Sequence, residues 1–297
     1  MVSTTVYFTF LFAALASLVS AVPRPKINDA PPDATAGRRR GCGVHIDQSR
    51  VASFEKKYQA HRLPPESENA TATLDVYFHV IYANETIEGG FVPDEQIKAQ
   101  VERLNTDYNT TGIKWNLKDI ERIENESWFL GVQPDGEVEA EMKNTHRKGD
   151  KAALNVYTAA LAEGDAAGIL GYATFPMDYE EKPENDGIVL LFSTLPGSNS
   201  KQYNMGRTLV HEAGHWAGLY HTFQGGCKGA GDEVDDTPPE ESAAYGCMKK
   251  RDTCPGDGPD PITNFMDYSD DSCMTGFTPG QAKRMKGQLR TYRGVDI

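Results

Sequence analysis

Histidine, cysteine and basic side chains are all scarce in this chain of 297 residues. It contains seven His and five Cys, and its 30 Lys and Arg are outnumbered by 43 Asp and Glu. The acidic balance argues against a nucleic-acid partner, because phosphate binding requires a basic face. After the first 21 residues, no stretch approaches the 18 apolar residues that a membrane span requires, so we expect no membrane partner either.

The first 21 residues predict a secretory signal peptide. Residues 7–18 form an apolar run of 12, too short to cross a bilayer, and Val19-Ser20-Ala21 offers small residues at a cleavage site. The basic start of a typical signal is missing, since Arg24 is the first basic residue of the chain. We expect the remainder to be secreted into the extracellular medium as a soluble protein.

Charge is unevenly distributed behind this signal. Residues 22–65 have a net charge of +5 and residues 66–297 one of −18. The Pro-rich front segment is expected to be a pro-region or linker rather than a packed unit. It is either an inhibitory pro-segment held by charge or a soluble leader. Its Arg38-Arg39-Arg40 run is either a cut site for a basic-specific protease or a solvated charge cluster.

One short stretch concentrates metal-binding side chains, in the pattern His211-Glu212-x-x-His215-x-x-Gly218-x-x-His221. Histidines four apart project from the same face of a helix and can bind one metal ion. Gly218 can adopt backbone conformations closed to other residues, so the chain can turn there and bring His221 back as a third ligand. Three imidazoles and one open position are typical of catalytic zinc, whereas four protein ligands close a structural site.

Glu212 follows the first of these histidines, which directs its carboxylate toward a metal-held water. We therefore predict a zinc-bound water that Glu212 activates. The alternative is a pair of solvated helix histidines beside an incidental glutamate. That alternative suits a bare His-Glu-x-x-His better than the extended pattern, because the whole chain has only seven His.

Hydrophobic patterning surrounds this motif with strands and helices. Continuous or alternating apolar runs predict strands, and apolar residues at helical spacing predict helices. The strand at 168–173 is a candidate edge for pairing with an extended peptide. His79, within a strand, is expected to be a core histidine rather than a ligand. The expected strands are 74–82, 113–123, 153–159, 168–173 and 188–192, and the expected helices are 93–108, 205–218 and 278–292.

The cysteines divide into one near the front and four crowded between residues 227 and 273. In an oxidising compartment the four predict two disulfides, although spacing alone leaves three pairings open. Cys42 is either a latency thiol that occupies the open metal position or a free or extra-paired cysteine. Export also suits the Asn-x-Ser/Thr sequons, although such triplets also arise by chance. The sequons lie at Asn69, Asn84, Asn109 and Asn125.

From residue 222 to about 261 the chain is rich in Gly, Asp and Pro, which predicts an irregular segment stapled by cysteines. Its acidic cluster combines Asp232, Asp235 and Asp236 with the Thr237 hydroxyl. Such an oxygen-rich cluster suits calcium, and the alternative is an acidic solvated loop.

Residues 211–221, taken with Met266 in the stretch 264–268, resemble the metzincin metalloproteases. The chain is more closely similar to the pappalysin family, and within it to secreted fungal extracellular metalloproteases, through residues 231–238, the four cysteines and residues 277–281. The resemblance covers about residues 73–293. It implies an α+β catalytic domain with a twisted mixed sheet packed on an active-site helix and a backing helix. An irregular, disulfide-stapled C-terminal subdomain would follow.

The resemblance also implies roles for individual residues. Met266 would form an apolar floor beneath the zinc ligands, and Tyr268 would donate a hydrogen bond to the tetrahedral intermediate. Calcium would be bound around Asp232 and Thr237, and Cys42 has family precedent as a latency thiol. The implied disulfides are Cys227–Cys254 and Cys247–Cys273.

We therefore predict a secreted zinc endopeptidase, monomeric and acting on extracellular proteins or peptides. The resemblance further implies nutritional breakdown of external protein and a contribution to infection of a host. One alternative is a binding protein that kept the scaffold without turnover, and another is a zinc hydrolase acting on a non-peptide bond. The expected layout is a signal peptide at 1–21, a pro-region or linker at 22–65, the N-terminal part of the catalytic domain at 66–221 and a C-terminal subdomain at 222–297.

Overall fold

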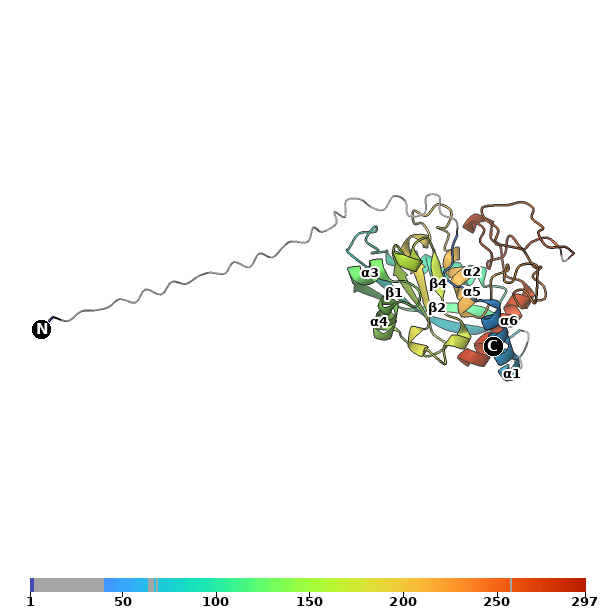
Figure 1. The fold of residues 1–297 in the computed structure, drawn as a ribbon, viewed down its shortest axis with the longest axis horizontal. Helices are drawn as coiled ribbons and strands as arrows, with labels where there is room; N and C mark the ends of the chain where they lie inside the picture. The colour runs from blue at the N-terminus through green and yellow to red at the C-terminus, as the bar shows by residue number, and fades with distance from the viewer. Residues whose placement is uncertain (3–39, 64–66, 68, 257) are drawn as a thin grey trace. The chain divides into compact units, whose positions relative to one another are not determined.

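The computed structural model describes residues 1–2, 40–63, 67, 69–256 and 258–297 (Figure 1). The expected signal peptide, the Pro-rich stretch and Arg38-Arg39 lie outside this part of the chain. From Arg40 onward the described residues belong to one compact unit. Among the described residues, no helix combines the length and the apolar character that a membrane crossing requires.

A five-stranded mixed sheet forms the centre of this unit, in the order β2-β1-β3-β5-β4. The first four strands in that order are parallel, and β4 pairs antiparallel with β5 at one edge. Every residue of β3 and β5 is buried, as expected of strands covered on both faces, and β5 is a continuous apolar run. The strands are β1 Ala72–Tyr82, β2 Ile113–Glu124, β3 Leu154–Ala159, β4 Gly171–Ala173 and β5 Ile188–Leu191.

The expected active-site helix and backing helix are both present. They are α5 (Arg207–Trp216) and α2 (Asp94–Asp107), and they contact each other and the sheet. Their apolar side chains share one core with β1, β3 and β5. Because α5 is buried from Thr208 to Trp216, the metal-binding motif lies inside the molecule.

Two short helices were not expected from the sequence: α3 (Glu126–Gly131) and α4 (Glu137–His146). Helix α3 contacts β1 and β3 and begins at Asn125, whose side chain accepts a hydrogen bond from the Trp128 amide. Helix α3 has only six residues, and most residues of α4 are polar, so neither shows enough apolar periodicity to be predicted.

The expectation that residues 22–65 do not pack is wrong for residues 40–61. This front segment contains α1 (Gln48–His61), which lies against α6 (Pro279–Arg293), as the blue and red helices of Figure 1 show. Only Val51, Glu55 and Tyr58 of α1 are buried. With so few apolar contacts, and a charged residue among the three, the helix gives almost no amphipathic signal in the sequence.

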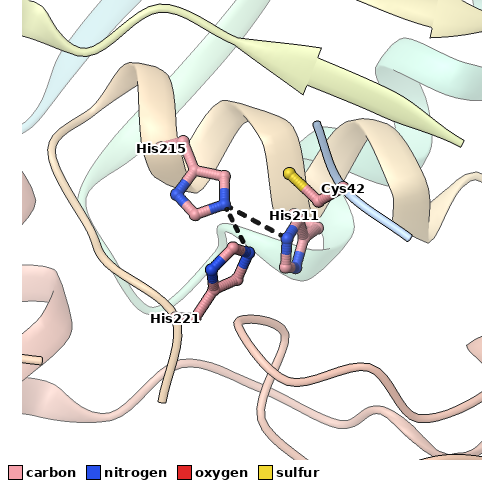
Figure 2. A group of neighbouring side chains, drawn as sticks. All are labelled: Cys42, His211, His215 and His221. Atoms are coloured by element: carbon pink, nitrogen blue, oxygen red, sulfur yellow. Dashed lines mark hydrogen bonds between the residues drawn. The ribbon is translucent and has the colours of Figure 1, made fainter. Parts of the chain in front are cut away.

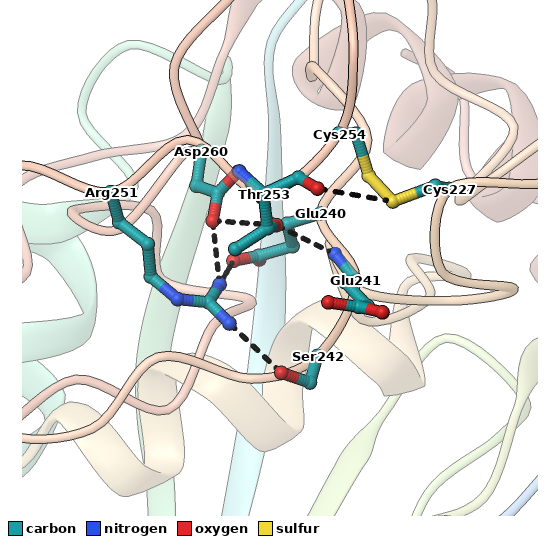
Figure 3. The surroundings of a disulfide bond; sticks show 8 residues. All are labelled: Cys227, Glu240, Glu241, Ser242, Arg251, Thr253, Cys254 and Asp260. Atoms are coloured by element: carbon teal, nitrogen blue, oxygen red, sulfur yellow. Dashed lines mark hydrogen bonds and ion pairs between the residues drawn. A yellow bond between two sulfur atoms is a disulfide. The ribbon is translucent and has the colours of Figure 1, made fainter.

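Between α5 and α6 the described chain forms no sheet strand, and two disulfides cross-link it. They join Cys227 to Cys254 and Cys247 to Cys273, which is the pairing that the resemblance implies. Beside the first disulfide, Arg251 bridges two carboxylates, Glu240 at 2.8 Å and Asp260 at 2.7 Å (Figure 3). These cross-links replace the secondary structure that the irregular segment lacks.

Candidate metal centre

Helix α5 and the turn after it bring three histidines to one point. His211 and His215 project from one face of α5, Gly218 reverses the chain with a φ of 100°, and His221 returns to the same place. All three imidazoles are buried. The Nε2 atom of His215 lies 3.2 Å from that of His211 and 3.1 Å from that of His221 (Figure 2).

Hydrogen bonds on the far side of two rings fix which nitrogen is free. His211 Nδ1 donates to the Phe265 carbonyl at 2.7 Å, and His215 Nδ1 donates to the Leu219 carbonyl at 2.8 Å. Because a carbonyl oxygen only accepts, each Nδ1 carries the hydrogen and each Nε2 keeps its lone pair. Lone pairs facing one another at this separation require something between them. Tetrahedral zinc, with bonds of about 2.0 to 2.1 Å, would place its nitrogen ligands about 3.3 Å apart, so the donor set fits zinc.

Burial keeps these imidazoles neutral, which metal binding requires. It lowers the pKa of His215 to about 4 and the pKa values of His211 and His221 well below their ordinary value. The close approach of the rings lowers the pKa of His211 and His221 further, since each would repel a charged neighbour.

The Cys42 thiol completes a cluster of four ligand atoms. Its Sγ and one nitrogen of each of the three histidines all lie within 4.8 Å of one another. The thiol also donates to Glu212 Oε2 at 3.3 Å. Burial raises the pKa of Cys42 well above its ordinary value and that of Glu212 to about 8. The Cys42 thiol and the Glu212 carboxylate therefore lie together in one buried site.

The front segment reaches the site along the free edge of β4. Gly43 N donates to the Gly171 carbonyl at 2.9 Å, and Leu170 N donates to the Gly41 carbonyl at 2.7 Å. Cys42 thereby pairs with Gly171 in parallel orientation. The sequence predicts this edge for an extended peptide, and here the chain's own segment occupies it.

Arg40 anchors the same segment, a role that no sequence pattern indicates. Its guanidinium is buried, forms an ion pair with Asp271 and donates to the Ser269 carbonyl at 3.2 Å. Of the two alternatives for the Arg38-Arg39-Arg40 run, a solvated charge cluster is therefore wrong for Arg40, and cleavage of the run stays a prediction. Asp271 also accepts from the Met205 amide, just before α5, so this anchor lies beside the metal-binding helix.

Met266 and Tyr268 both lie at the centre, in a turn within the loop that the Cys247–Cys273 disulfide closes. Met266 is buried directly against α5, because a Cβ added to Gly214 would lie 2.4 Å from its sulfur. The Tyr268 hydroxyl lies 3.3 Å from His221 Nε2 and accepts from the Cys42 amide at 3.2 Å.

The acidic cluster after His221 is only partly as expected. Asp232 is buried, and both its oxygens lie within 2.8 Å of the Thr237 hydroxyl, which also lies 2.8 Å from the Val234 carbonyl. Burial raises the pKa of Asp232 to about 7. Asp236 does not join this group; its carboxylate accepts from the Thr278 hydroxyl and the Gly280 amide at the start of α6.

His79 and the four sequon asparagines lie away from the metal centre. His79 is fully buried between strands, as expected of a core histidine. Asn69 and Asn109 are exposed, whereas Asn84 and Asn125 are half-buried. Glycosylation of the four sequons stays a prediction.

Two histidines lie on one helix, a glycine turn returns a third histidine to them, and a methionine lies beneath. This arrangement defines a metzincin-type metallopeptidase. Comparison with known proteins gives the family. The family of peptidase M43, described as pregnancy-associated plasma protein-A, matches residues 137–290. The chain belongs to this family, the pappalysins, and is a metallopeptidase.

Relatives that align with most of the chain are described as extracellular metalloproteases. An extracellular metalloprotease of Colletotrichum graminicola is 41% identical over 95% of this chain and 98% of its own length. Extracellular metalloprotease 1 of Coccidioides posadasii is 44% identical over 75% of this chain and 79% of its own length.

Among solved structures, a promirolysin mutant of Tannerella forsythia has a TM-score of 0.69 and 26% identity, covering 85% of this chain and 95% of its own. Mature mirolysin in complex with a cleaved peptide covers 75% and 96%, with a TM-score of 0.62 and 27% identity.

Proposed function

We propose that this chain is a secreted zinc endopeptidase that digests extracellular proteins. The observation that supports it best is the convergence of the Nε2 atoms of three histidines, with the Glu212 carboxylate beside them. His211, His215 and His221 would hold the ion. When bound, zinc supplies a Lewis acid that polarises a carbonyl oxygen and lowers the pKa of water to about 7.

The protein's own groups would handle protons and charge. Glu212 accepts a proton from the attacking water and gives it to the leaving amine, a role that its buried position and raised pKa favour. Tyr268, with its hydroxyl 3.3 Å from His221, donates a hydrogen bond to the oxyanion.

Digestion of casein or gelatin, with mapping of the products, tests this function. We expect new peptide termini, loss of cleavage on adding a chelator, and recovery on adding zinc. Binding without cleavage would instead favour a binding protein, and cleavage of a non-peptide bond alone would favour a different zinc hydrolase. Nutritional digestion of external protein is the role proposed for the secreted enzyme; a contribution to infection stays a prediction.

We also propose that residues 40–61 keep the enzyme latent. Cys42 occupies the position of a fourth ligand and bonds to Glu212, while residues 41–43 cover the β4 edge. A full-length Cys42→Ala chain should hydrolyse protein without removal of the segment, whereas the unmodified full-length chain should not. Equal activity of the two uncleaved chains would contradict latency by this thiol.

Calcium is proposed at Asp232 and Thr237. The Thr237 hydroxyl has one hydrogen but faces three acceptor oxygens, two from Asp232 and one from Val234. A cation bound to those oxygens would remove this excess of acceptors, and oxygen ligands are what calcium prefers.

A further inference from the structure

Helix α6 holds the end of the metal-binding helix through its arginines. The last carbonyls of a helix have no partner within it. Arg284 Nε donates to the Gly218 carbonyl at 2.9 Å, and Arg293 Nε donates to the Trp216 carbonyl at 3.2 Å. Gly218 is the residue at which the chain reverses toward His221, so the Arg284 bond fixes the turn that delivers the third histidine.

The rest of the Arg284 guanidinium binds the front segment. Its two terminal nitrogens contact the Glu55 carboxylate of α1 at 2.5 and 3.2 Å, and Tyr220 donates to the same carboxylate at 3.1 Å. Arg284 also lies over the Tyr220 ring, 4.8 Å from its centre. Glu55 and Arg284 are both buried. One side chain therefore contacts both the zinc-binding turn and the segment that blocks the site.

We propose that Arg284 is a positioning residue of the zinc site and that α1 docks on it through Glu55, which gives the latent form a second attachment besides Cys42. This inference rests on the proposed latency and zinc binding. It separates two functions of one guanidinium. The Nε bond to Gly218 serves the metal site, and the terminal nitrogens serve the docking of α1.

The physical basis is the burial of the pair. Two buried opposite charges depend on each other, because removal of one leaves the other without a partner in a medium that solvates it poorly. Loss of the Glu55 charge should therefore release α1 while the Nε bond to Gly218 remains. Loss of the Arg284 side chain should release α1 and also free the Gly218 carbonyl.

The reactivity of Cys42 measures docking, because it is the only free thiol among the chain's five cysteines. Labelling by a thiol reagent would be followed in the full-length chain, in Glu55→Gln and in the control Lys56→Gln, which changes an exposed neighbour in the same helix. We expect at least tenfold faster labelling of Glu55→Gln and an unchanged rate for Lys56→Gln. Labelling of Glu55→Gln at the unmodified rate would overturn the docking of α1 through this pair.

Zinc release to a chelator tests the positioning role, measured on zinc-loaded chains that all carry Cys42→Ala so that loss of the thiol ligand does not affect the comparison. In this background Arg284→Gln should release zinc at least tenfold faster than the Cys42→Ala chain, while Glu55→Gln stays within about twofold because its Arg284 still binds Gly218. Arg284→Lys serves the same comparison if the Gln variant does not fold. Unchanged zinc release from a folded Arg284 variant would overturn the positioning role. Fast labelling of Cys42 in the unmodified chain would instead contradict the proposed latency itself.

Discussion

At the scale of single residues, the site depends on hydrogen-bond partners that fix the tautomer and orientation of the metal-binding histidines. The Phe265 and Leu219 carbonyls decide which nitrogen of His211 and His215 carries hydrogen. Backbone oxygens of this kind are supplied by every residue and leave no mark in a sequence. The motif predicts that imidazoles meet, but the hydrogen-bond partners that orient them come only from the fold.

Asp186 is a second residue of this supporting kind. It is buried beneath the end of α5, where it forms an ion pair with Arg293 at 2.9 Å and accepts from Trp216 Nε1 at 3.2 Å. Burial opposes its ionised form, but the charge and hydrogen bonds of Arg293, together with the Thr174 hydrogen bond and the Arg147 charge, hold the pKa of Asp186 below its ordinary value. The ionised carboxylate therefore stabilises the folded state above the pKa of the unfolded chain, about 4, and this contribution is lost as pH falls through the folded pKa.

We predict that Asp186→Asn lowers the free energy of unfolding at pH 7 by about 3 kcal/mol, because it leaves Arg293 buried without its partner. The difference between the unmodified chain and the variant should shrink as the pH falls below about 4. Urea unfolding of both chains at pH 7 and pH 3.5 measures this. A difference that is the same at both pH values would contradict the ion pair.

At the scale of elements, the decisive arrangement is the sharp end of α5 against α6. Gly218 has a φ of 100°, and a Cβ on it would lie 2.5 Å from Gln288 Cγ. The sequence predicts the turn from the glycine, since other residues rarely adopt this conformation. It does not predict the close approach of α6, which is set by how the two helices pack.

Gly218→Ala should therefore cost more than its backbone conformation alone. Gly229→Ala is a matched control, because Gly229 also has a positive φ, 81°, but no atom within 4 Å of the added Cβ. We predict that the control loses about 1 kcal/mol of unfolding free energy and retains zinc. Gly218→Ala should lose more and release zinc faster. Thermal unfolding and zinc content of the two variants measure this, and equal effects would contradict the role of the α6 contact.

Elements with a strong apolar pattern could be predicted from the sequence whatever their length, and elements without one could not. Helix α5, β1 and β5 have strong periodic or continuous apolar patterns, and the structure places them as expected. Helix α1 attaches through Glu55, a charged residue that a pattern assigns to solvent. Arg40 is likewise a charged residue that the sequence pattern assigns to solvent, but it is buried in an ion pair with Asp271. Buried ion pairs between distant segments depend on tertiary contacts, so no local pattern reveals them.

At the scale of the whole molecule, two disulfides cross-link the region that has least secondary structure, and the proposed cation would lie in the same region. The disulfides span 27 and 26 residues. In the chain-entropy account, each loop of that length contributes about 3.5 kcal/mol. The cluster at Asp232 lies in the same region and would add a stabilisation that depends on calcium concentration.

We predict that calcium at 100 times its dissociation constant stabilises the chain by about 2.7 kcal/mol, which would raise Tm by several degrees. Asp232→Asn should abolish this increase. The control Asp235→Asn, at an exposed position directly after Val234, should keep the calcium-dependent increase in Tm. Tm is measured with calcium and with a calcium chelator at constant zinc. A calcium effect that survives Asp232→Asn would place the ion elsewhere.

If three imidazoles bind zinc and Glu212 carries the proton, loss of the Glu212 carboxylate should remove hydrolysis but leave the zinc in place. Zinc content and casein hydrolysis would be determined on the same processed preparations of the unmodified chain, Glu212→Gln and the exposed control Glu95→Gln. All three should contain about one zinc per chain, and only Glu212→Gln should lose activity, by a factor of about 100 or more. A zinc-free active enzyme, or hydrolysis by Glu212→Gln at the unmodified rate, would contradict the account.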